Sequence, residues 1–155
     1  MKVEHEKLNW LFNHLNEQYN FKFDCCGTKE NTRCLRYPRS GKFTDINELN
    51  EIAWMNPSQE KPDFMFEHFF KIIKGGIAIY RCDNMNSNIW QDIIIPKGHW
   101  VFILNEKQNN DNFIISELKF PTAIIGIGVN LPEGLNGRVL GLSGQLIYPH
   151  ARFYL

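Results

Sequence analysis

The segment from Pro62 to Cys82 reads PDFMFEHFFKIIKGGIAIYRC and predicts a helix, a glycine stop and a strand. Four of its apolar residues follow the i, i+3, i+4, i+7 spacing of one helix face, namely Phe66, Phe69, Phe70 and Ile73. Pro62 suits the first helical turn, and we expect Gly75-Gly76 to end the helix with positive φ angles. The consecutive apolar residues Ile77–Tyr80 indicate a strand covered on both faces. We therefore place this segment at the core and expect Phe69 and Phe70 to be nearly inaccessible.

The length and composition are those of one folded domain. With 155 residues, 43% of them apolar and 14% aromatic, the chain can bury a sizeable core, and we expect residues 1–155 to form a single domain. Its net charge is zero, so attraction to a charged partner must come from a local patch. No apolar run approaches the roughly 20 residues that cross a bilayer, and the N-terminal stretch lacks the apolar core of a secretory signal. We expect a cytoplasmic protein that does not bind membranes, and the abundance of Asn and Ile suggests a microbial, phage or viral source.

The first helix is expected from about Glu4 to Tyr19, with one apolar face packed on the core. Trp10 points away from that face, and His14 lies beside it. Two interpretations account for Trp10. A later loop covers it, because large aromatic side chains are seldom left bare, or it is an anchor for a binding partner.

Turn-forming residues place the next two elements. The segment GTKENT separates Phe21–Cys26 from Arg33–Tyr37, and we interpret these two runs as the arms of a hairpin. A short helix is then expected through about Met55, capped by Thr44 or by Asp45, with Glu48 completing a capping box if Asp45 is the cap and with Trp54 off the buried side.

The second half of the chain has the pattern of strands. Expected strands are Ile89–Ile95 and His99–Leu104, joined as a hairpin by PKG, then Phe113–Phe120 and Ala123–Val129, with one or two more in the tail. Gly126 and Gly128 leave one face of a strand bare, which permits close approach of another element or a ligand. The whole pattern predicts an α+β fold with about three helices, mostly in the first half, packed on a largely antiparallel sheet of five to seven strands.

Residues 29–42 form a basic arm, the one concentrated charge in the sequence. Its cations are Lys29, Arg33, Arg36, Arg39 and Lys42, and Tyr37 lies among them. A solvated surface arm would have this composition. So would a site for phosphates or for an acidic protein, because Arg supplies paired donors and Tyr a stacking face.

No catalytic signature is present. Ser143 lies in GLSG but lacks the second flanking glycine of a nucleophile elbow, and a thiol mechanism would need Cys25, Cys26 or Cys82 beside His68, His99 or His150. The cysteines, including Cys34, are spaced poorly for zinc, so we expect buried or half-buried free thiols and no metal or cofactor. A Cys26–Cys34 disulfide is the alternative if the protein is exported.

Two segments resemble known families. PDFMFEHFFKIIKGG, with the later KGHWVFILNEKQNNDNFIISEL, looks somewhat like the SUKH superfamily, whose members have a helix ending in Gly-Gly and later strands and often serve as immunity proteins. LPEGLNGRVLGLSGQL is similar to the segment around the Arg-Ser-Ser motif of dCTP deaminases and dUTPases. Leu142 and Gly144 replace the Arg and the second Ser of that motif, and the later Asp-bearing motif is missing, which counts against that activity.

These patterns favour a small cytosolic binding protein without enzymatic activity, of the immunity or inhibitor kind, that occupies the surface of a protein partner with acidic character. The alternative is a small enzyme or binder that acts on a nucleotide or nucleic acid through residues 29–42. The candidate partner-binding residues are Arg33, Arg36, Tyr37, Arg39, Lys42 and Trp10.

Overall fold

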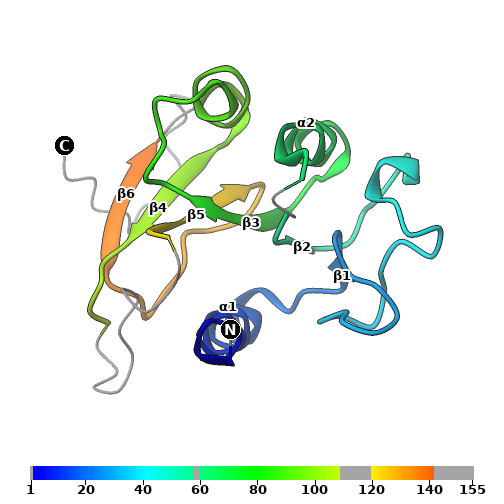
Figure 1. Cartoon of the computed structure of the whole chain (residues 1–155), viewed down its shortest axis with the longest axis horizontal. Helices are drawn as coiled ribbons and strands as arrows, with labels where there is room; N and C mark the ends of the chain where they lie inside the picture. The colour runs from blue at the N-terminus through cyan, green and yellow to red at the C-terminus, as the bar shows by residue number, and fades with distance from the viewer. Residues whose placement is uncertain (1, 58–59, 109–119, 142–155) are drawn as a thin grey trace.

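The computed structural model describes residues 2–57, 60–108 and 120–141, and this part of the chain forms a six-stranded mixed sheet with helices on both faces (Figure 1). This confirms the expected α+β class, with three α-helices on a mostly antiparallel sheet. In chain order the elements are α1 (Lys2–Tyr19), β1 (Phe23–Asp24), the 3-10 helix η1 (Phe43–Asp45), β2 (Ala53–Met55), α2 (Pro62–Ile72), β3 (Gly76–Arg81), the π-helix η2 (Ile89–Ile94), α3 (Ile95–Lys97), β4 (Trp100–Leu104), β5 (Thr122–Ile127) and β6 (Gly137–Gly141).

The strands lie in the order β1-β2-β3-β5-β4-β6. The first three are parallel to one another, and the β3–β5, β5–β4 and β4–β6 pairs are antiparallel. The predicted strand from Ile77 to Tyr80 is thus confirmed as β3, in the interior of the sheet. The two-residue β1 lies at one end of the strand order.

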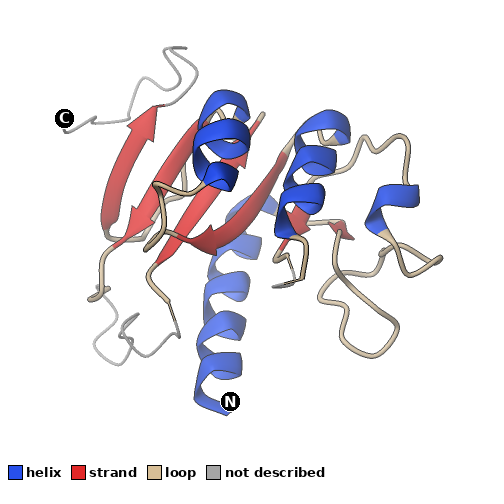
Figure 2. Ribbon diagram, turned by 45° about the horizontal axis from the view of Figure 1, so that its top comes forward, coloured by secondary structure: helices blue, strands red, loops and turns tan. Residues whose placement is uncertain are grey.

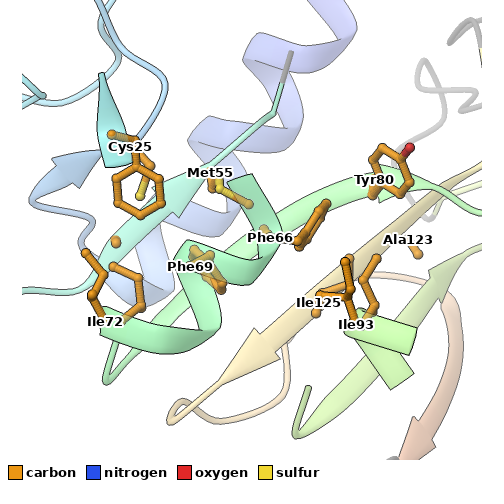
Figure 3. Packing of buried hydrophobic residues seen from close by; sticks show 14 of the residues in the cluster. Cys25, Met55, Phe66, Phe69, Ile72, Tyr80, Ile93, Ala123 and Ile125 are labelled. Carbon is orange, nitrogen blue, oxygen red and sulfur yellow. The ribbon is translucent and has the colours of Figure 1, made fainter. Parts of the chain in front are cut away.

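Two cores lie on opposite faces of the sheet because successive strand residues point to opposite sides. Ile77 and Ile79 of β3 pack toward α1, whereas Ala78 and Tyr80 pack toward α2 and η2. Figure 2 shows α1 on one side of the sheet and the other helices on the opposite side. We call the two sides the α1 core and the α2 core. The α2 core, seen in Figure 3, holds Phe66 and Phe69 from α2 beside Met55, Tyr80, Ile93 and Ile125.

Helix α2 matches its sequence pattern with two corrections. Phe69 is fully buried as expected, but Phe70 is only half-buried. The expected positive-φ glycine exit is also wrong, because the helix ends in an extended residue, Ile73, with φ −79° and ψ 125°. The glycines instead allow close packing. A Cβ on Gly76 would lie 2.8 Å from the carbonyl oxygen of Ala53 on β2.

The helix expected from Asp45 to Met55 is wrong. The chain forms only the short η1, runs extended through a bridge between Leu49 and Ile73, and enters β2. Ala53 and Met55 of β2 face the α2 core, while Trp54 between them is buried in the α1 core. Burial of this run on both sheet faces outweighs the local helix-capping signal.

The strand expected at Ile89–Ile95, and hence its hairpin with His99–Leu104, is also wrong. These residues form η2 and lead into α3, and the Trp90 indole Nε1 donates a hydrogen bond to the Arg81 carbonyl at 2.9 Å. The strand at His99–Leu104 is confirmed as β4, which pairs with β5 and β6 instead. The predicted strand at Phe113–Phe120 and the tail after Gly141 fall outside the described residues, except Phe120 itself.

Within residues 2–57, 60–108 and 120–141, no helix has both the length and the apolar character that a membrane crossing requires.

Candidate partner-binding surface

The basic arm does not form the expected hairpin. The Asp24 carboxylate accepts N–H bonds from Cys26 at 3.2 Å and from Arg33 at 2.9 Å, which folds the intervening residues into a compact loop. The chain then returns beside β1 in the parallel direction, with a bridge between Phe23 and Arg36. Burial raises the pKa of Asp24, and the two N–H donors partly offset that rise. An Asp followed by turn residues is a known local loop signal, and the hairpin interpretation overlooked it.

Arg33 faces α1. Its guanidinium donates to the Asn9 side chain and lies 5.6 Å from the centre of the Phe12 ring. Burial lowers the pKa of Arg33. The structure therefore separates Arg33 from the other arm residues and gives it contacts that hold the loop on the first helix.

Three of the remaining arm residues, Arg36, Tyr37 and Arg39, line a surface groove of about 330 Å³, which we call the arm groove. Its lining residues are Phe23, Arg36, Tyr37, Arg39, Ser40, Asp45 and Ile46. The Arg39 guanidinium lies 4.4 Å from the centre of the Tyr37 ring and donates from Nη1 to the Tyr37 hydroxyl at 3.0 Å. This stacking holds a positive charge at the groove wall, with guanidinium donors left for a ligand.

The arm cations differ in how far they are already neutralised. Arg36 makes a 2.7 Å ion pair with Glu51, and its side chain is 59% exposed. In the part of the chain that the structure describes, neither Arg39 nor Lys42 has a carboxylate within ion-pairing distance, and both are exposed. Arg39 and Lys42 are therefore the cations most able to meet an external anion.

An exposed leucine adjoins these charges. Leu35 is 90% exposed, directly before Arg36. Leu35 is not among the candidate residues, which are charged or aromatic, because the sequence does not reveal its exposure. A single exposed apolar side chain is common on protein surfaces, and here it adds apolar area beside the charges of the arm.

Trp10 is not among the residues that line the arm groove. It is half-buried and stacked on His14, with ring centres 5.2 Å apart. His14 Nε2 bonds the Glu133 carbonyl at 2.8 Å, and the Tyr19 hydroxyl donates to the Asn130 carbonyl at 2.6 Å. A later loop thus docks on α1 near Trp10, whose own side chain stays half-buried.

The cysteines are free thiols, with Cys25 and Cys34 buried and Cys26 and Cys82 half-buried. Burial raises the pKa of Cys34 to about 12, and burial likewise raises the pKa values of Cys25 and Cys82. A thiol with such a pKa is almost wholly protonated at neutral pH and is a poor nucleophile.

The histidines and acidic side chains of the described residues do not form a metal centre. Across the described ranges, no three or more His, Cys, Asp or Glu side chains gather as metal ligands would. His68 Nε2 bonds the Ile46 carbonyl at 2.6 Å, and His99 Nδ1 accepts the Gly128 N–H at 2.9 Å. These rings are engaged with the main chain, and His150 lies outside the described residues.

Comparison with protein-family models, with curated proteins and with solved structures found no match for this chain. The two family resemblances of the sequence therefore stay predictions.

Proposed function

We propose that this chain is a binding protein without enzymatic activity, of the immunity or inhibitor kind, that docks an acidic surface of a protein partner on the arm groove. One observation carries the proposal. Arg39 is held on the Tyr37 ring at the wall of a groove, without a carboxylate partner among the described residues. An oriented cation that stabilises no ion pair within its own fold is suited to meet an anion on another molecule.

The surroundings of the groove favour a protein over a nucleic acid. Asp45 lines the groove and Glu51 pairs with Arg36, so the positive charge is confined to a few points and does not form the continuous basic stripe that a row of phosphates requires. Leu35 adds exposed apolar surface beside these charges, which apolar side chains of a protein partner can cover. The stacked Arg39 and Tyr37 give the alternative, a nucleotide or nucleic-acid ligand, its one specific support, since a base can stack on such a platform.

The test is affinity capture from an extract of the source cells, with nuclease treatment in one arm. The baits are the wild-type chain and the double variant Arg39→Glu/Lys42→Glu, with Glu67→Ala on the exposed face of α2 as a matched control. We expect wild type and control to retain one stoichiometric acidic protein with or without nuclease, and the double variant to lose it. Recovery of nucleic acid or nucleotide instead would support the alternative.

A further inference from the structure

The arm also forms the outer border of the sheet. Phe23 of β1 is paired with Ala53 of β2 on one side and with Arg36 on the other. Figure 1 shows β1 at one end of the sheet, beyond β2. Residues 35–37 therefore lie outside β1 as a rudimentary further strand.

The direction of one peptide group at this border follows from covalent geometry. The Arg36 carbonyl accepts the Asp24 N–H at 2.9 Å and so points toward β1. The described chain has no cis peptide bond, and in a planar trans peptide the C=O and the next N–H point in opposite directions. The Tyr37 N–H therefore points away from β1. Within the described residues it has no hydrogen-bond partner.

We propose that an extended acidic segment of the partner adds to this border as a further strand and pairs with the main chain at residues 35–37. This inference rests on the proposed function and supplies its binding mode. The Tyr37 N–H donates to a carbonyl of the incoming strand, and Leu35 packs against its apolar side chains. Arg39 and Lys42 bind its carboxylates. A segment that alternates apolar and acidic residues meets both requirements.

Charge selects this occupant over a second copy of the chain. Pairing two such borders would bring the cations of one arm beside those of the other, and like charges that face each other across paired strands are destabilising. Short, charged borders are a common protection against self-association. An acidic strand turns the same charges into attraction.

The test uses the full-length chain labelled with ¹⁵N and a short synthetic peptide of alternating Val and Glu. A second peptide has the same sequence with alternate amides N-methylated, which removes strand pairing but keeps charge and side chains. A third has Lys in place of Glu. We expect the first peptide to shift the Tyr37 amide signal and slow its hydrogen exchange. N-methylation should weaken binding by about tenfold or more, since main-chain bonds supply the affinity, and the Lys peptide should not bind.

The outcomes separate the two proposals. Equal binding of the plain and N-methylated peptides, abolished by Arg39→Glu/Lys42→Glu, would overturn strand addition and leave acidic docking in place. An unshifted Tyr37 amide with the Val-Glu peptide at saturation would also overturn strand addition. If the double variant retains the captured partner as well as wild type does, the proposed function itself fails.

Discussion

The Trp100 indole lies directly against the backbone of Gly126, its register partner on β5. A Cβ at position 126 would lie 2.1 Å from Cζ2 of that ring. Trp100 is fully buried, and its Nε1 donates to the Val129 carbonyl at 3.0 Å. The ring is therefore held in place by a hydrogen bond as well as by packing. The bare glycine face expected from the sequence thus accommodates an aromatic side chain of the neighbouring strand.

Gly126→Ala should therefore destabilise the fold. The added methyl group overlaps a ring that has no free space to move into, and such overpacking costs about 1–3 kcal/mol. Chemical denaturation would measure the loss, with the exposed Glu67→Ala as the control expected to stay within about 0.5 kcal/mol of wild type. An unchanged midpoint for Gly126→Ala would contradict this packing.

Three phenylalanines of α2 form a graded series. Phe69 is fully buried, Phe70 is half-buried and Phe64 is 56% exposed. Replacing Phe69 by Ala should lower the free energy of unfolding by about 3–5 kcal/mol, because it removes a fully buried ring. Phe70→Ala should cost less and Phe64→Ala least. Denaturation midpoints in any other order would show that α2 does not pack on the sheet by its Phe69 face.

The Cys34 thiol should make stability fall at alkaline pH. Burial raises the pKa of Cys34 from 9.0 to about 12, so above pH 9 the unfolded chain releases a proton that the folded chain retains. The stabilisation is fully present below pH 9 and is lost progressively toward pH 12.

The measurement is the difference in unfolding free energy between wild type and Cys34→Ala as pH rises. That difference should shrink from about pH 8 to about pH 10.5, because the variant lacks the ionisable thiol. Parallel curves for the two proteins would show that Cys34 ionises equally in the folded and unfolded states.

The sequence predicted the elements whose burial pattern is local. The central helix, the strand after it, the first helix and β4 all show an apolar period that one element can explain. The run Ile89–Ile95, IWQDIII, is rich in β-branched and aromatic residues, which favours a strand, but the polar Gln91 and Asp92 interrupt it. In the structure Trp90, Ile93 and Ile94 share a buried helix face. Their i, i+3, i+4 spacing is that of a helix, but a run this short does not by its pattern alone distinguish a helix from a strand.

Long-range packing decided what the sequence missed. The run Ala53–Met55 is buried on both faces because its side chains alternate between the α2 core and the α1 core, and no local pattern encodes the insertion of β2 between β1 and β3. The concentration of Lys and Arg in residues 29–42 is visible in the sequence, but the different surroundings of the individual side chains are not. Arg33 turns to α1, whereas Arg39 stacks on Tyr37. Nothing in the sequence indicates that Leu35 is exposed, and only the structure shows it.

The arm cations should differ in their effect on stability. Arg39→Glu/Lys42→Glu should leave the melting temperature nearly unchanged, because both side chains are exposed and exposed charges contribute little to stability. Arg36→Glu should lower it slightly, because it would place a carboxylate beside Glu51, 2.7 Å from the present guanidinium. Thermal unfolding of the three proteins would check this. A large loss in the double variant would mean that Arg39 and Lys42 have a structural role.

The most direct test of the central claim is the binding of the captured partner to wild type and to Arg39→Glu/Lys42→Glu, measured by surface plasmon resonance in rising salt. We expect the double variant to bind on the order of tenfold more weakly or worse, with much of the loss in the association rate, and the wild-type affinity to fall as salt increases. A shallow salt dependence would fit a protein partner, and a steep one would fit a nucleic acid. Equal affinity of the two proteins for that partner would contradict the claim that this arm is the binding site.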